Sequence, residues 1–162
     1  MRKRILIVAL LSLAAAIAAN AQTLQVRQYA AKFVCGRATD AQVGTFDFAP
    51  GSYYTTINVH YPALTGGIDF RKKFALAERN EQPGKISPWF GATLKADEAM
   101  QIDCGSIYKH LGIAPGTFID GFAVIQISNP KVELDVVGVY TASPGNGVSS
   151  IHTERVAGRI TQ

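Results

Sequence analysis

Residues 118–142 form the most apolar stretch of the chain after its N-terminus, and they constrain the fold more than any other segment. A polar turn at residues 128–131 (SNPK) divides this stretch into two runs that are rich in β-branched residues, which is typical of two strands joined by a turn. The second run alternates apolar and polar side chains, whereas the first is apolar on both faces, as in a strand covered on both sides. We therefore expect a hairpin at the centre of a β-sheet core.

Shorter segments with the same alternation recur along the chain between turns that contain Pro and Gly. A short helical turn is expected before Gly112, starting near Asp103. About seven to eight short strands with one helical turn predict an all-β fold, namely an antiparallel β-sandwich. The further strands are expected at residues 25–36, 52–61, 68–77 and 150–156, with a weak edge strand within 37–48 and a turn followed by a strand within 94–104.

The N-terminus has the pattern of a secretory signal peptide. Three basic residues precede an uncharged apolar run of about fifteen residues, which ends in a small-x-small cleavage site before Gln22. This run is shorter than the roughly 20 residues that a membrane-spanning helix needs. We therefore predict a cleaved leader at residues 1–21 and a single mature domain at residues 22–162, exported to the periplasm or the extracellular space without a membrane anchor.

The basic charge of the chain belongs mostly to this leader. The whole sequence holds 16 Lys and Arg residues and 12 Asp and Glu residues, a formal charge of +4. Residues 1–21 contribute three basic and no acidic residues, which leaves a mature charge of +1 over 141 residues. A protein with so little net charge gives no reason to expect nucleic acid as a partner.

The two cysteines, Cys35 and Cys104, predict one disulfide bond. An even number of cysteines in an exported domain favours a structural bridge, and neither residue lies in a CxxC motif or close to a histidine in the sequence. A reactive or metal-binding pair is the less favoured alternative. Closing a loop of this length stabilises a fold by about 4 kcal/mol in the chain-entropy model.

The longest loop-like segment, residues 78–91, contains the only Trp of the chain. Trp89 and Phe90 follow Pro88, and because most Trp side chains are largely buried, we expect Trp89 to cap the core. The alternative is a contact surface for a ligand or partner, since long loops often carry binding. The basic triplet at residues 71–73 (RKK) is expected to mark a solvated strand edge rather than an anion site.

No catalytic motif is evident in the sequence, so we expect no catalytic residue, no bound metal and no cofactor. There is no GxSxG motif, and His60, His110 and His152 stand alone. His60 and His152 could meet across strands, although solvated histidines are the simpler expectation. A glycosidase-like carboxylate pair could be drawn from several acidic residues, as in most domains of this size: Asp97, Glu98, Asp103, Asp120, Glu133 and Asp135.

Five segments taken together resemble a group of small exported bacterial proteins, and this resemblance implies no activity. They are residues 32–36 (KFVCG), 50–62 (PGSYYTTINVHYP), 70–77 (FRKKFALA), 96–104 (ADEAMQIDC) and 121–142. More loosely, residues 57–62 and 124–128 are similar in strand layout to the sensory rhodopsin transducer family. That resemblance implies a β-sandwich that forms homo-oligomers and binds a small ligand or a partner. The leader and the two cysteines depart from that family.

From these features we expect an exported, non-enzymatic binding or interaction module whose partner is an unknown protein or small ligand, and which can form a homo-oligomer. Trp89 and Phe90 are its candidate contact residues. Two alternatives stay open at this point: a periplasmic hydrolase that uses carboxylates, and a subunit of a surface assembly built through exposed strand edges.

Overall fold

The computed structural model describes residues 25–39, 48–143 and 149–162 of the chain. Within these ranges it contains ten strands, all paired antiparallel, and one short helix. In chain order they are β1 (Val26–Ala38), β2 (Gly51–His60), β3 (Gly67–Ala77), β4 (Pro83–Ile86), β5 (Phe90–Lys95), β6 (Ala99–Asp103), α3 (Cys104–Leu111), β7 (Ile119–Ile127), β8 (Asp135–Ser143), β9 (Ser150–Arg155) and β10 (Arg159–Thr161).

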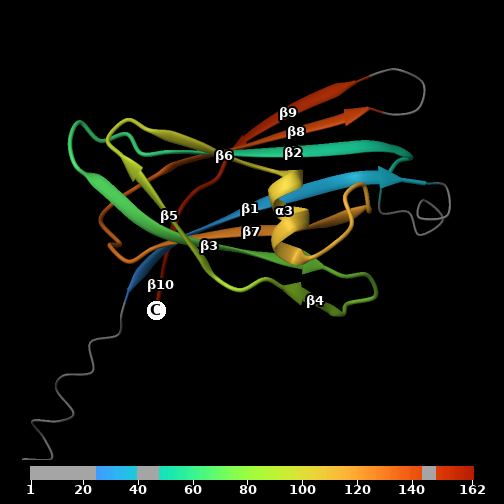
Figure 1. Ribbon diagram of the computed structural model, residues 1–162, viewed down its shortest axis with the longest axis horizontal. Helices are drawn as coiled ribbons and strands as arrows, with labels where there is room; N and C mark the ends of the chain where they lie inside the picture. Colours follow the sequence, from blue (N-terminus) through green and yellow to red (C-terminus); the bar gives the residue numbers. More distant parts are fainter. Residues whose placement is uncertain (1–24, 40–47, 144–148) are drawn as a thin grey trace, which may run out of the picture.

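The strands form two layers that are continuous at one corner. The first layer has the order β10-β1-β7-β3-β5, with β4 beside the end of β3, and the second has the order β6-β2-β8-β9. They join where the end of β1 pairs with the start of β2, so that β9, β8, β2, β1, β7, β3 and β4 follow one another from top to bottom in Figure 1. The fold is therefore the predicted all-β antiparallel sandwich.

A buried threonine explains how β1 and β2 separate after this corner. The backbone pairing of β1 with β2 ends at the Gly36–Tyr53 pair. Two residues further on in each strand, the Thr55 side chain bonds to the backbone of Val34 instead. The Thr55 hydroxyl donates to the Val34 carbonyl and accepts from the Val34 N–H, both at 2.9 Å. Backbone groups that would be unpaired at the branch are thus satisfied, as buried polar groups must be.

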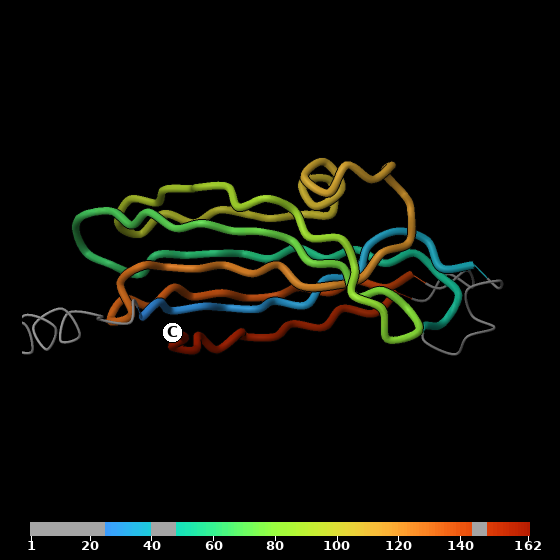
Figure 2. Tube along the Cα trace, turned by 90° about the horizontal axis from the view of Figure 1, so that it is seen from below, coloured from blue at the N-terminus to red at the C-terminus, as the bar shows by residue number. Residues whose placement is uncertain are grey.

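The core lies between the two layers and is closed at one side by α3. Inward-facing residues of β1, β2, β3, β7 and β8 form one buried cluster with Ile107 and Leu111 of the helix. Figure 2 shows α3 lying against one side of the strands. Asp103 caps the helix by accepting a 2.7 Å hydrogen bond from the Ser106 N–H, and Gly112 ends it with a φ of 63°. The helical turn expected before Gly112 is confirmed.

The predicted disulfide is present. Cys35 of β1 and Cys104, the first residue of α3, are bonded, with their Cα atoms 5.7 Å apart and 69 positions apart in the sequence. The bond ties the first layer to the helix that follows β6 of the second layer. The residues of the expected leader, 1–21, and most of the weak edge strand within 37–48 lie outside the described ranges.

The prediction of a central hairpin is wrong. β7 pairs with β1 and β3 in the first layer, whereas β8 pairs with β2 and β9 in the second. The polar turn between them does exist, with the Asn129 side chain accepting from the Lys131 N–H at 3.1 Å, but it carries the chain across to the other layer. The crossing is fixed by the Tyr29 hydroxyl, which accepts a 2.8 Å hydrogen bond from the Leu134 N–H.

Three smaller expectations also need correction. β7 is not covered on both faces, because Phe122 on its outer face is 42% exposed. The loop expected at residues 78–91 contains β4, and the polar end of the chain forms β10 against β1. β5, which begins within the same loop, is a third strand outside the expected ranges, and with β4 and β10 it brings the number of described strands to ten.

Candidate functional site

Strand β3 presents its three consecutive cations to opposite faces of the first layer. Side chains alternate along a strand, so Lys72 points inward with Phe70 and Phe74, whereas Arg71 and Lys73 point outward. The basic triplet is therefore not a solvated edge: β3 is flanked by β7 on one side and by β5 and β4 on the other. Only two of its three charges face solvent, and they lie on the same face.

Trp89 lies against these two outward cations. The Arg71 guanidinium carbon is 4.6 Å from the centroid of the Trp89 ring, and the Lys73 Nζ is 4.7 Å from it, both within cation–π range. Trp89 is held there because Phe90 pairs with Lys72 and because the Ser87 N–H donates to the Phe74 carbonyl at 2.8 Å. The Trp89 residue is 36% exposed and is not part of the core cluster, so the expectation that it caps the core is wrong.

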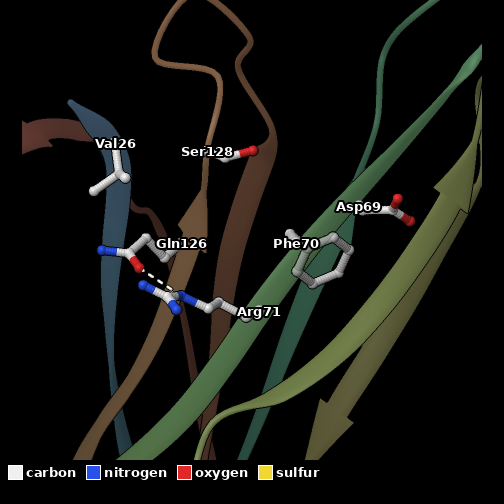
Figure 3. Close-up of a pocket in the computed structure, with 6 residues that line it drawn as sticks. All are labelled: Val26, Asp69, Phe70, Arg71, Gln126 and Ser128. Atoms are coloured by element: carbon white, nitrogen blue, oxygen red, sulfur yellow. Dashed lines mark hydrogen bonds between the residues drawn. The ribbon is translucent and has the colours of Figure 1, made fainter. Parts of the chain in front are cut away.

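Arg71 also borders a hollow at the end of β7, which Figure 3 shows. Its Nε donates a 2.7 Å hydrogen bond to the Gln126 side-chain oxygen, which fixes the guanidinium over β7. The hollow has a volume of about 270 Å³ and is lined by Val26, Asp69, Phe70, Arg71, Gln126 and Ser128. It forms where β7 ends between the starts of β1 and β3. We refer to Arg71, Lys73, Trp89 and Gln126 as the Arg71–Trp89 surface.

This surface has an excess of positive charge. Among the described residues, neither Arg71 nor Lys73 forms a salt bridge with a carboxylate. The Asp69 carboxylate, which lines the hollow, accepts a 2.6 Å hydrogen bond from Thr93 and points away from Arg71 in Figure 3. Two cations and an exposed indole can together hold an anionic group, because the ring shields part of the site from water.

Phe90, the second predicted contact residue, lies on the opposite face of the first layer from Trp89. Its ring stacks on His110 with the centroids 3.8 Å apart and packs against the core with Phe74. Sequence reasoning paired these two residues because they are adjacent, but adjacent residues at the start of a strand point to opposite faces. The residues that it missed are Arg71, Lys73 and Gln126, and the shared face of Arg71 and Lys73 was the signal that could have found two of them.

Among the residues that the structure describes, Lys72 is the one cation buried in the core. It is 5% exposed, and its Nζ lies 5.1 Å from the Phe90 ring centroid and 3.8 Å from Met100 Sδ. Burial lowers the pKa of Lys72, since desolvation disfavours the charged form. Within the described part of the chain, no carboxylate forms a salt bridge with it.

The outer face of the second layer carries a different arrangement around His60. Its Nε2 lies 3.0 Å from Asp97 Oδ1 and its Nδ1 lies 3.3 Å from Asp135 Oδ2, and Arg155 pairs with the same Asp135. The hydrogen bond to Asp97, followed by the one to Asp135, raises the pKa of His60. Because both ring nitrogens contact carboxylates, neither is left to activate a nucleophile.

The other acidic residues considered for hydrolysis serve separate local contacts. Glu133 pairs with Arg27, Asp120 pairs with Lys32, and Asp103 caps α3. Glu98 accepts from the Lys95 N–H at 2.8 Å. The structure therefore brings together only Asp97 and Asp135 of this set, and His60 lies between them.

The possible histidine pair is not brought together. His60 is paired in register with Asp135 at the start of β8, whereas His152 on β9 is opposite Tyr140, five residues further along β8. Among the described residues no group of three or more His, Cys, Asp or Glu side chains is placed to hold a metal ion.

Comparison with known proteins finds no family model, no curated protein and no solved structure that matches this chain. The resemblances to a group of exported bacterial proteins and to the sensory rhodopsin transducer family therefore stay predictions. In the described ranges there is also no helix of the length and apolar character that a membrane crossing requires.

Proposed function

We propose that this chain is an exported, non-enzymatic binding module whose Arg71–Trp89 surface captures anionic ligands of the acidic-sugar type. The observation that carries the proposal is the contact of the exposed Trp89 ring with two cations, Arg71 and Lys73, that have no carboxylate partner among the described residues. Lys32 on the same layer, by contrast, is paired with Asp120.

The geometry of Arg71 suits an incoming carboxylate. Its Nε is used by Gln126, so the terminal guanidinium nitrogens are left to donate a pair of hydrogen bonds to one ligand group. Lys73, two residues along the same face, adds a second positive charge. A carboxylate at this position is attracted by both cations without displacing an internal ion pair.

The sugar character of the ligand is inferred from the other groups around Arg71. The hollow offers the Gln126 amide and the Ser128 hydroxyl, which can bond to sugar hydroxyls. Trp89 is not part of this lining but contacts Arg71, and its ring can lie against the apolar face of a sugar ring. The hollow's volume of about 270 Å³ is near the lower limit of small-molecule pockets, which favours one ring unit of a longer chain.

Export is supported by the disulfide between Cys35 and Cys104, because such bonds persist mainly in oxidising compartments. The basic and apolar sequence of residues 1–21 supports the same route. The proposal places the mature chain in the periplasm or outside the cell, where acidic polysaccharides are accessible.

The test uses Trp89 as its own reporter, since it is the only Trp of the chain. Tryptophan emission is recorded while polygalacturonate is added to the mature protein, with neutral dextran and poly-glutamate in parallel. We expect saturable emission changes with polygalacturonate, none with dextran, and weaker binding at high salt because the attraction is screened.

Two matched double variants remove the same amount of charge. R71Q/K73Q should lower the affinity for polygalacturonate at least tenfold, whereas K109Q/K131Q, which neutralises two exposed lysines elsewhere, should leave it unchanged. Equal affinity of both variants would refute the site. Equal binding of poly-glutamate would refute the sugar character of the ligand while retaining its anionic character.

A further inference from the structure

The edge strand β9 lacks the usual protection of a strand edge. Its six residues pair with β8 in an unbroken register, and all six are exposed, Ile151 to the extent of 73%. The sequence SIHTER contains no Pro or Lys, which are among the devices that discourage strand-to-strand association. Its two charged side chains already have partners on β8, since Glu154 accepts from the Tyr140 hydroxyl and Arg155 pairs with Asp135. An unprotected, regular edge of this kind can accept another strand.

The other described edges are shorter, irregular or carry a protecting residue. β6 has five residues, and β5, which has six like β9, ends in Lys95. β4 has four residues, begins with Pro83, and pairs with β3 through a register shift. β10 has only three residues. β9 is therefore the better template for an added strand.

The backbone groups on the free side of β9 can be identified from one hydrogen bond. The Val156 N–H donates to the Val136 carbonyl at 2.8 Å, which extends the β8–β9 register by one pair. Since such pairs alternate along an antiparallel ladder, Glu154 and His152 also direct their backbone groups toward β8. Ile151, Thr153 and Arg155 then direct theirs to the free side.

These three free positions are self-complementary about Thr153. If a second β9 strand pairs antiparallel with Thr153 opposite Thr153, then Ile151 is opposite Arg155 of the second copy, and Arg155 is opposite Ile151. Every outward-directed backbone group of β9 thereby finds a partner of the required type. A two-fold axis through Thr153 relates the two copies, as the commonest form of closed symmetry requires.

The side chains are complementary in the same register. On one face, His152 is brought opposite Glu154 of the second copy, and Glu154 opposite the second copy's His152, which gives two reciprocal pairs of a basic and an acidic group. On the other face, the Thr153 side chains meet at the axis, and Ile151 packs on the aliphatic part of Arg155. Like charges are not opposed at any of these positions.

We propose that the chain forms a two-fold symmetric homodimer by antiparallel pairing of β9 with β9 of a second copy, with Thr153 on the axis. The dimer joins the two second layers into one continuous sheet. It also leaves the Arg71–Trp89 surface, which belongs to the first layer, free in each copy, so the pairing does not depend on the ligand proposed above.

Disulfide trapping tests the register. In T153C, two symmetry-related thiols face each other across about 5.5 Å between Cα atoms, within the range of a disulfide. Diamide, which takes up the two hydrogens lost by the thiols, should convert the variant into a covalent dimer on non-reducing gels. In I151C and R155C the equivalent thiols lie about four residues out of register, and these variants should stay mainly monomeric on the gel. Equal trapping of all three variants, or none of T153C, would overturn the register.

Sedimentation equilibrium of the unsubstituted mature protein tests the dimer independently. We expect twice the chain mass at tens of micromolar protein. T153P should be monomeric with an unchanged circular dichroism spectrum, since the Thr153 N–H points away from β8, whereas T153A should still dimerise. A monomeric mass of the unsubstituted protein at all concentrations would overturn the proposal.

Discussion

His60 on the outer face of the second layer is paired with carboxylates, whereas, among the described residues, Arg71 and Lys73 on the outer face of the first layer are not. On the second layer, His60 lies between two carboxylates, and Asp135 also pairs with Arg155. On the first layer, Arg71 and Lys73 contact the Trp89 ring and form no salt bridge with a described carboxylate. The charges around His60 thus connect the strands of the second layer and the turn before β6. Arg71 and Lys73 stay available to a ligand, unlike Lys32 on the same layer, which pairs with Asp120.

This difference implies that charge removal should have opposite consequences on the two faces. Substitutions around His60 should alter folding stability and its pH dependence, while substitutions of Arg71 and Lys73 should alter binding alone. Both expectations require the two layers to behave as one folded body, so the first prediction concerns the bond that links them.

Removing the disulfide should have the largest effect. C35A/C104A opens a loop of 69 residues, and the chain-entropy model gives a loss of about 4 kcal/mol in the free energy of unfolding. Urea denaturation followed by circular dichroism and by Trp89 emission measures this loss. If the two probes gave separate transitions, the layers would be unfolding independently and the comparison of their faces would lose its basis.

Replacing the buried cation of β3 should raise stability. K72M keeps the length of the side chain and removes an ammonium that has no described carboxylate partner, so we expect a gain of roughly 1 kcal/mol. Because the folded pKa of Lys72 is lowered, the unfolded chain binds more protons, and the gain should shrink as the pH rises toward 10.5. A loss of stability in K72M at pH 7 would contradict this account. K73M, at the adjacent outward position, is the matched control and should change stability little.

The His60 contacts should make a smaller, pH-dependent contribution. The folded pKa of His60 is raised above 6.5, so the stabilisation is fully present below pH 6.5 and is lost as the pH rises through the folded pKa. The difference in urea midpoint between the unsubstituted protein and H60Q should therefore be larger at pH 5.5 than at pH 8.5. Other titrating groups, including His110, are present in both proteins, so their contributions to the pH dependence cancel in this difference. A difference independent of pH would show that His60 contributes by packing only.

The smallest effect on stability is expected at the Arg71–Trp89 surface. R71Q/K73Q removes two outward cations that connect no strands through ion pairs, so the free energy of unfolding should change by less than about 0.5 kcal/mol. The same urea measurement at pH 7 tests this. A loss above 1 kcal/mol would mean that the cations hold Trp89 in place for the fold rather than for a ligand.

The sequence was sufficient to locate most strands, because alternation of apolar and polar residues reports directly which face is buried. It also indicated the disulfide, since two cysteines in a chain with a predicted export leader favour one structural bridge. It could not indicate which strands pair. The turn at residues 128–131 has the same composition whether the chain folds back into a hairpin or crosses to the other layer, and the deciding contact, from Tyr29 to Leu134, is 105 residues apart.

The candidate site was missed in part because residue-type preferences were given more weight than position. The alternation of β3 places Lys72 inward and Arg71 and Lys73 outward, a pattern that is incompatible with one solvated edge formed by all three. Similarly, Trp89 was expected in the core because most Trp residues are buried. Its contact with Arg71 depends on the pairing of β5 with β3, which only the folded chain displays.

The most direct test of the central claim gives Arg71 and Lys73 a carboxylate partner, as His60 already has on the second layer. Val124 lies opposite Lys73 on the outer face of β7, so V124E places a carboxylate beside these cations, and V124Q is the neutral control. Titration with polygalacturonate, followed by Trp89 emission, should show at least tenfold weaker binding for V124E and nearly unchanged binding for V124Q. Unchanged affinity of V124E would contradict the claim that unpaired cations beside Trp89 capture the ligand.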